Sequence, residues 1–151
     1  MNTVPERALI IRKPWSEHIL NGDKTWELRG KNTKIRGPVA LIEGGSGKIV
    51  GMFNIDDCSS PLSREERVLA AKEGKILDCE IDEDMYTHVY AWKLSQVVRF
   101  ENPVDYKHPS GAVIWVTMTD EDKSNMLKEI EKIEIKKALD SDNKKQYILK
   151  K

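Results

Sequence analysis

Residues 8–29, ALIIRKPWSEHILNGDKTWELR, pass from a strand pattern to a helix pattern and back, and this stretch decides the fold. The run at 8–11 is apolar and partly β-branched, which predicts a buried strand. Pro14 is tolerated in a first helical turn and Gly22 can take the left-handed stop conformation, so a short helix is expected between them. Residues 24–29 alternate apolar and polar side chains, as in a strand. The chain therefore begins with a strand–helix–strand unit.

Further short apolar runs, separated by glycine and proline, follow this unit. Ser63 and Glu66 have the spacing of a capping box, which predicts a helix that ends at Gly74. Residues 102–111 have the composition of a loop. Strands are expected at residues 39–42 and 49–55, joined by a glycine turn at 44–47, at 86–94 with a continuation at 97–100, and at 112–118. Strands outnumber helices, so an α+β fold is predicted.

The composition changes after Thr119, where lysine, glutamate and isoleucine dominate. Leu127, Ile130 and Ile133 form an incomplete apolar stripe, which predicts a charged helix at the C-terminus. We expect a domain at residues 1–119 and a helical extension at residues 120–151, frayed from Asp140 onward. The extension either covers the sheet or binds a partner.

Charge is balanced over the whole chain but unevenly distributed along it. The 25 Lys and Arg residues equal the 25 Asp and Glu residues, and 39% of the 151 residues are hydrophobic, which disfavours intrinsic disorder and a uniformly polycationic nucleic-acid binder. Residues 7–36 hold eight cations and three anions, whereas residues 56–84 hold four cations and ten anions. A basic amino-terminal face would orient an anionic partner, and the alternative reading is ordinary solvated charge.

Several classes of protein are disfavoured by what the sequence lacks. No apolar run approaches the roughly 20 residues of a membrane span, and the first residues have no signal-peptide core, so a cytoplasmic protein is expected. The two cysteines and three histidines are scattered, without the spacing of metal ligands or of a disulfide framework. We therefore expect no metal and no cofactor.

Residues that carry chemistry gather in the opening unit. Lys13, Trp15, Lys24, Glu27 and Arg29 combine cations, an aromatic ring and a carboxylate. Lys and Arg neutralise phosphate, Trp stacks on a base, and a carboxylate accepts the amino hydrogens of a base edge. The other reading is that Glu27 and Arg29 pair across their strand face while the tryptophans of this unit belong to the core.

The same residues resemble a known family. The GxKxxExR pattern of residues 22–29, preceded by KPW at 13–15 and a short helix, resembles the ASCH domain of the PUA-like superfamily. The glycine turn after 39–42 and HPSG at 108–111 agree with the layout of that family, and the resemblance covers residues 8–118. It implies a PUA-like mixed β-barrel with short peripheral helices and a positively charged cleft beside the first helix.

The resemblance also implies a function. Members of the family are thought to bind RNA, in RNA processing, translation or transcription coactivation, so the expected ligand is single-stranded RNA or a nucleotide-like molecule. The cleft residues carried over from the family are Lys13, Trp15, Lys24, Glu27, Arg29 and, from the glycine turn, Ser46. Tyr106, Lys107 and His108 are added on chemical grounds, because such a loop can stack on bases and contact phosphate.

Two alternatives stay open. Some relatives resemble amidohydrolases of 4-acetylcytidine, which use a Lys and a Thr on the equivalent strand with a Glu farther on, and at least one member is a ribonuclease. This chain keeps the Lys as Lys24 but has Glu27 in place of the Thr, so Lys24 and Glu27 are the catalytic candidates if it is an enzyme. The third reading is a protein-interaction adaptor that binds a partner through its acidic helix and C-terminal extension.

Overall fold

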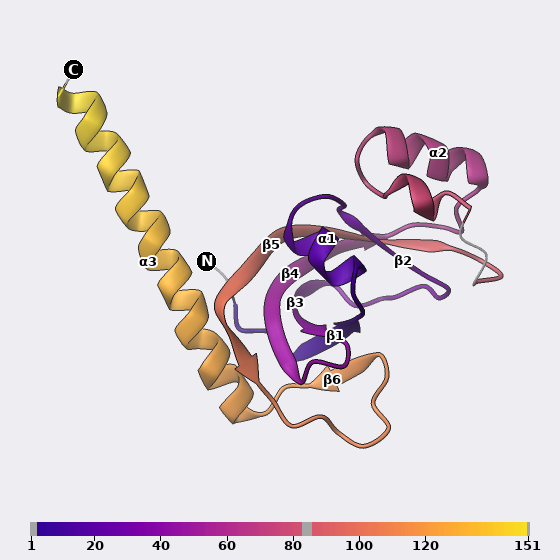
Figure 1. Ribbon diagram of the computed structural model, residues 1–151, viewed down its shortest axis with the longest axis horizontal. Helices are drawn as coiled ribbons and strands as arrows, with labels where there is room; N and C mark the ends of the chain where they lie inside the picture. The colour runs from indigo at the N-terminus through magenta and orange to yellow at the C-terminus, as the bar shows by residue number, and fades with distance from the viewer. Residues whose placement is uncertain (1–2, 83–85, 151) are drawn as a thin grey trace.

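The predicted strand–helix–strand unit is present as β1 (Arg7–Ile11), α1 (Trp15–Leu20) and β2 (Trp26–Arg29). The structure is a computed structural model that describes residues 3–82 and 86–150. Four more strands follow, namely β3 (Gly37–Glu43), β4 (Lys48–Cys58), β5 (Tyr90–Asp105) and β6 (Trp115–Thr117). Together with β1 and β2 they form one curled sheet (Figure 1).

The sheet has the strand order β2-β5-β4-β3-β1-β6. β1 runs parallel to β3, and the other four pairings are antiparallel. β2 and β6 are therefore the two edges. The predicted α+β class and the barrel-like mixed sheet of the PUA-like fold are confirmed.

The structure corrects several strand boundaries. β5 begins at Tyr90 and not at residue 86, and β2 begins at Trp26 and not at residue 24. β5 extends through Asp105, although a loop was expected from residue 102, because β4 supplies partners along both of its halves. The register between β4 and β5 shifts at several points, and Gln96, with φ of 50°, lies where β5 bends. The strand expected at 112–118 is shorter, because β6 pairs only with the first residues of β1.

The core lies on both sides of the sheet. One cluster contains Leu9, Ile19, Phe53 and Trp92, and it places α1 against the sheet. A second cluster joins strand residues to α3 (Asp120–Lys150), whose Met126 is fully buried. The first part of the predicted extension therefore completes the core of the sheet.

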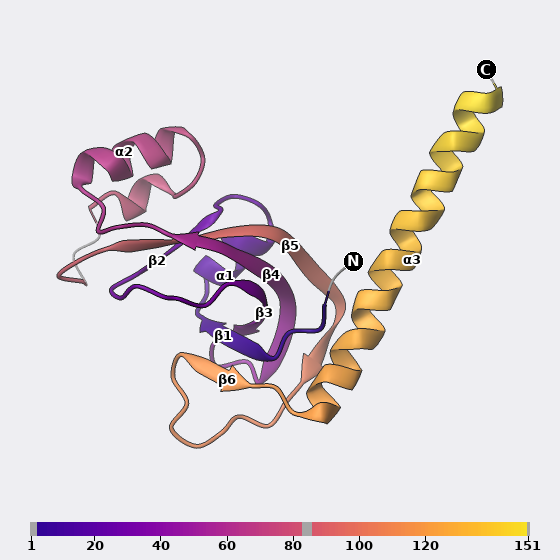
Figure 2. The same ribbon diagram turned by 180° about the vertical axis from the view of Figure 1, so that it is seen from behind.

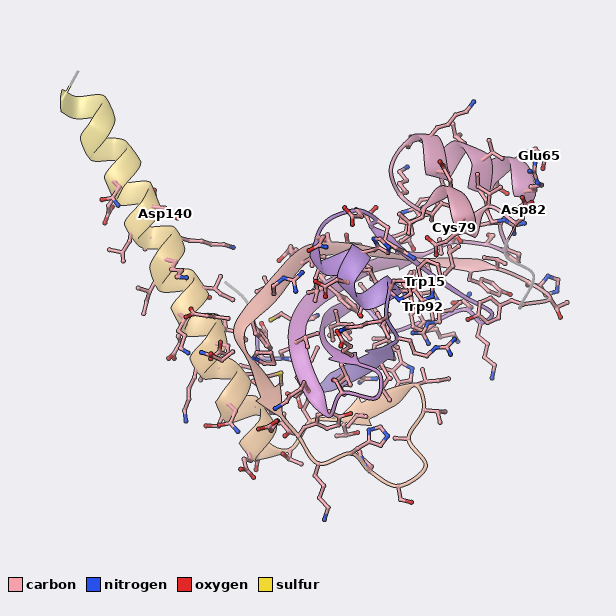
Figure 3. All side chains as sticks on the ribbon, viewed as in Figure 1. Trp15, Glu65, Cys79, Asp82, Trp92 and Asp140 are labelled. Carbon is pink, nitrogen blue, oxygen red and sulfur yellow. The ribbon has the colours of Figure 1, made fainter. Side chains whose placement is uncertain are left out.

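An arm projects from the sheet between β4 and β5. It consists of α2 (Arg64–Lys72), which has the predicted capping box, and of the short 3₁₀ helix η1 (Asp78–Glu80), which the sequence did not predict. The arm packs on β2 through a small cluster that includes Leu28 and Ala70. Figure 3 shows Glu65 and Asp82 on this arm, which carries much of the acidic segment.

α3 continues without a break to Lys150, past Asp140 where fraying was expected. Its C-terminal half extends away from the sheet in both views (Figures 1 and 2), and Asp140 lies on this half in Figure 3. Ile135 and Leu139 are more than half exposed there. A separate unit at residues 120–151 that binds a protein partner stays a prediction. Within the described residues, every helix is too short or too polar to cross a membrane.

Candidate functional site

The candidate site lies along the seam between the two edge strands of the curled sheet. Here side chains of β2 and of its neighbour β5 contact β6 and its neighbour β1. Arg29 on β2 donates from its guanidinium to the carbonyl oxygen of Ile10 on β1, at 2.9 Å. Trp92 on β5 and Trp115 on β6 stack across the seam with 5.8 Å between ring centroids and 12° between planes.

Two adjoining pockets make up this site, which we call the seam cleft. The ionic pocket has a volume of about 210 Å³ and the aromatic pocket about 460 Å³. Both are lined by Arg29 and Tyr86, so they share a wall. The ionic pocket is also lined by Ile10, Arg12, Trp15, Glu27, Leu28, Glu80 and Val113. The aromatic pocket is also lined by Gly30, Lys31, Asn32, Thr33, Trp92, Ile114 and Trp115.

A buried cluster of four charged side chains forms the floor of the ionic pocket. Lys24 Nζ donates to Glu80 Oε2 at 2.6 Å and lies 3.7 Å from Glu27 Oε1. Arg29 Nε donates to Glu27 Oε2 at 2.9 Å. The Lys24 side chain has no exposed surface, whereas the two carboxylates line the pocket. A ligand in the pocket therefore contacts the carboxylates, and Lys24 holds them from behind.

Local structure explains this arrangement. Glu27 and Arg29 are two residues apart on a strand, so their side chains lie on one face, as the alternation predicted. Glu80 comes from η1, where its second oxygen accepts the backbone N–H of Leu77 at 3.0 Å. The ion pair between Lys24 and Glu80 thus ties the arm to the sheet beside the cleft.

The two tryptophans of the opening unit have different environments. Trp15 lines the ionic pocket, and the ammonium of Lys24 lies 5.0 Å from its ring centroid. Trp26 is half-buried at the base of the arm, with the ammonium groups of Lys75 and Lys93 each 5.0 Å from its ring. Trp26 is therefore a cation–π residue and not part of the main core.

Aromatic rings form the walls of the aromatic pocket. Trp92 Nε1 donates to the carbonyl oxygen of Lys31 at 2.9 Å, which fixes the start of the loop after β2. Tyr86 lies directly over Gly30, where an added Cβ would be 2.6 Å from its Cδ1 atom. Glycine at position 30 therefore lets the ring approach the backbone. Figure 3 shows Trp15 and Trp92 near one another on the side of the sheet that carries α1.

The rim of the cleft is partly apolar and partly cationic. Val113 on the loop before β6 lines the ionic pocket and is 76% exposed. Arg12 and Lys31 are exposed on the same rim, and no ion pair or hydrogen bond from either side chain occurs among the described residues. The cleft therefore combines stacking surfaces, two fixed carboxylates and free cations, which suits a planar heterocycle that carries an anionic group.

Six predicted site residues line neither pocket of the described structure: Lys24 lies behind the carboxylates, Tyr106 is described below, and the other four are exposed. Lys13 is exposed and pairs with Glu43 at 3.3 Å. Ser46 lies in the turn between β3 and β4, where its hydroxyl donates to the carbonyl oxygen of Glu43 at 2.6 Å. Lys107 and His108 lie in the loop after β5, and both are exposed.

Tyr106, the remaining predicted residue, faces the core beside α3. It packs against the cluster that contains Met126 and hydrogen-bonds His108 Nδ1 at 2.8 Å. Burial, together with the nearby carboxylate of Asp122, raises the pKa of its hydroxyl. The structure thus brings Trp15, Lys24, Glu27 and Arg29 together and places Tyr106 elsewhere.

The sequence did not point to several residues that line the cleft. Glu80 lies in a helix that was not expected. Tyr86 and Trp92 belong to one predicted strand and Trp115 to another, so nothing in the sequence placed them in one pocket. Trp92 and Trp115 stood out only as tryptophans. Their meeting depends on the curl of the sheet, which no local pattern encodes.

Over residues 3–82 and 86–150, no three His, Cys, Asp or Glu side chains are grouped as metal ligands. The two carboxylates of the cleft are instead paired with Lys24 and Arg29.

Comparison with known proteins agrees with this fold. A family model described as the ASCH domain matches residues 9–104. The crystal structure of ASCH from Zymomonas mobilis superposes with a TM-score of 0.61 at 10% identity, covering 83% of this chain and 96% of that one. A serine-to-alanine variant of the Zymomonas mobilis protein gives a TM-score of 0.58 at 10% identity, covering 85% and 98%. No protein with a curated description matches the sequence significantly. The chain belongs to the ASCH domain family of the PUA-like superfamily.

Proposed function

We propose that the seam cleft binds single-stranded RNA or a nucleotide-like ligand. One observation carries the proposal: a pocket with two fixed carboxylates adjoins a pocket walled by Trp92, Trp115 and Tyr86. A base stacked on these rings would offer its amino hydrogens to Glu27 or Glu80. Arg12 and Lys31 on the rim would then contact the phosphate.

The geometry favours an unpaired base over a base pair. Both pockets lie between the edges of one sheet, and their volumes of about 210 and 460 Å³ suit a single nucleotide. Sequence-specific recognition of RNA uses unstacked bases, whose edges and faces are both accessible. A role in RNA processing, translation or transcription coactivation, and a cytoplasmic location, belong to the same proposal and rest on the family.

The test blocks the cleft without removing any of its charged groups. Val113 is 76% exposed at the mouth of the ionic pocket, so Val113→Trp would place an indole there at little cost in stability. Leu69→Trp is the matched control, because Leu69 is 58% exposed on α2 and lines neither pocket. The readouts are anisotropy of a labelled eight-nucleotide RNA and calorimetric titration with cytidine monophosphate.

We expect Val113→Trp to weaken binding of both ligands about tenfold or more, which corresponds to about 1.4 kcal/mol. Leu69→Trp should bind as the unmodified chain does. Binding should also weaken steeply as salt is raised, because cations release counterions from phosphate. Equal binding by all three proteins, or binding insensitive to salt, would refute the proposed site.

A hydrolase is the second candidate, and the paired carboxylates favour it. Glu27 and Glu80 face the pocket and share one buried ammonium, a set of groups able to move protons. In hydrolysis of 4-acetylcytidine, water would add to the acetyl carbonyl, the C–N bond would break, and acetate and cytidine would leave. 4-Acetylcytidine is incubated with the chain alongside the RNA, and chromatography of both samples detects cytidine or shortened RNA. Product that disappears in Glu27→Gln would support this candidate, and no product with either substrate would reject it.

A further inference from the structure

A second cavity lies beside the loop that leads from β2 to β3. Its volume is about 420 Å³, and it is formed where this loop passes the residues before and within β1. Three cations line it, namely Arg7, Lys34 and Arg36, and one carboxylate, Glu6. We call this cavity the cationic groove.

Two of the three cations of the groove are available to a ligand. Glu6 pairs with Lys123 at 2.5 Å, so its carboxylate is already neutralised. Arg7 and Lys34 are exposed, and within the described residues neither side chain has an ion pair or a hydrogen bond. Arg36 is engaged, since its guanidinium lies 3.6 Å from Asp57 Oδ1. The groove therefore presents two unpaired cations, Arg7 and Lys34, to a ligand.

The loop beside the groove is ordered by its own hydrogen bonds. The Thr33 hydroxyl accepts the backbone N–H of Ile35 at 3.1 Å. Arg36 donates from one guanidinium nitrogen to the carbonyl oxygens of Thr33 and Ile35, each at 2.9 Å. At the other end, Trp92 holds the carbonyl oxygen of Lys31. A ligand that binds here would meet a preformed surface.

The same loop lines the groove and the seam cleft. Residues 29–33 line the aromatic pocket, and residues 34–36 line the groove. Because an extended chain advances at most about 3.6 Å per residue, the Cα atoms of Lys31 and Lys34 lie within about 11 Å. About three nucleotide steps cover such a distance at the roughly 3.4 Å axial rise of a stacked strand.

We propose that the cationic groove is a phosphate-binding extension of the seam cleft, which holds the backbone of a single-stranded nucleic acid whose base occupies the aromatic pocket. The inference rests on the proposed function, since the groove alone offers charge but no aromatic wall. Arg7 and Lys34 contact phosphates, and Arg36 maintains the loop. The site accordingly takes several nucleotides and not one.

The experiment measures how binding of a labelled eight-nucleotide RNA depends on salt. The groove variant is Arg7→Gln with Lys34→Gln. The matched control is Lys72→Gln with Lys137→Gln, which removes two exposed cations of α2 and α3 that line neither the cleft nor the groove. Cytidine monophosphate is titrated in parallel, because its single phosphate is assigned to Arg12 and Lys31 on the rim of the cleft.

We expect the groove variant to reduce the slope of log Kd against log salt concentration by about 1.4, at about 0.7 for each phosphate contact on a single strand. The control should keep the original slope, and binding of the mononucleotide should not change. Equal slopes for the groove variant and the control would refute the proposal that the groove binds phosphate. Loss of RNA binding in Val113→Trp would still support the seam cleft as the base-binding site. An equal effect of the groove variant on the mononucleotide would also refute the proposal for the groove. If neither ligand binds the unmodified chain, the proposed function fails and the groove falls with it.

Discussion

Replacement of Lys24 by methionine is expected to be one of the most destabilising single changes in the chain. Methionine keeps an unbranched apolar stem of four heavy atoms, with sulfur in place of Cδ, and lacks the ammonium group. Lys24 is 1% exposed, so water does not replace the lost charge. Glu27 keeps Arg29 as a partner at 2.9 Å, but Glu80 keeps only the backbone N–H of Leu77. The variant therefore leaves one uncompensated carboxylate in the interior.

The magnitude follows from this asymmetry. Removal of one partner from a buried ion pair costs about 3–5 kcal/mol of unfolding free energy, because the other charge stays buried. Glu80→Gln should cost less, about 1.5–3 kcal/mol for a charge-assisted hydrogen bond, since Lys24 still has Glu27 at 3.7 Å. In the double variant no uncompensated carboxylate remains at position 80. The double variant should therefore be more stable than the two single losses predict, by about 2 kcal/mol.

Urea unfolding, followed by circular dichroism, measures all four proteins of this cycle. The reasoning would be refuted by a cost below about 1 kcal/mol for Lys24→Met, or by strictly additive losses in the double variant. The result also bears on binding assays. Because Lys24 is buried and supports the arm, a loss of binding in Lys24→Ala would not separate ligand contact from folding.

Three further outcomes test other parts of the fold. The Ser16 hydroxyl is buried without a hydrogen-bond partner among the described residues. Ser16→Ala should therefore raise the unfolding free energy measured in urea titrations by about 1 kcal/mol. A lower unfolding free energy would contradict this. At Gly51 an added Cβ would lie 2.2 Å from the Val98 carbonyl oxygen. Gly51→Ala should therefore lower the unfolding free energy by about 3 kcal/mol or more. An unchanged Tm would contradict this close approach of β4 and β5. Burial acts to raise the pKa of Glu129, but hydrogen bonds from Lys132 and from the backbone N–H of Asn102 outweigh it and leave the pKa below 4.5. Its stabilising contribution is therefore complete above about pH 4.5 and lost as the pH falls further. Glu129→Gln should accordingly lose less unfolding free energy on acidification than the unmodified chain. Parallel profiles of unfolding free energy against pH for the two proteins would contradict this.

Local patterns predicted most elements of the fold because each depends on a few neighbouring residues. The capping box at Ser63 and Glu66 marks the start of α2, and the glycines at 44–47 mark the turn between β3 and β4. The length of β5 was underestimated, since its second half is a strand only through its pairing with β4. η1 was missed because three residues carry too little periodicity to be recognised.

The candidate site was predicted to the extent that it is local. Lys24, Glu27 and Arg29 lie within six residues, and their spacing placed Glu27 and Arg29 on one face of a strand, where they hydrogen-bond. Glu80, although 56 residues from Lys24, completes the same cluster. A contact between residues so far apart cannot be predicted from the residues next to Lys24 or from those next to Glu80.

The ASCH family, the strand–helix–strand unit and the charged face of β2 can be predicted from the sequence, because these follow from the order and spacing of adjacent side chains. The position of the cleft and the residues that line it depend on the folded domain. The curl of the sheet brings the edge strands β2 and β6 to one seam, and so stacks Trp92 on Trp115 and sets the arm against Lys24. That curl results from strand pairing and packing across the whole domain, and for this reason no single stretch of the chain contains it.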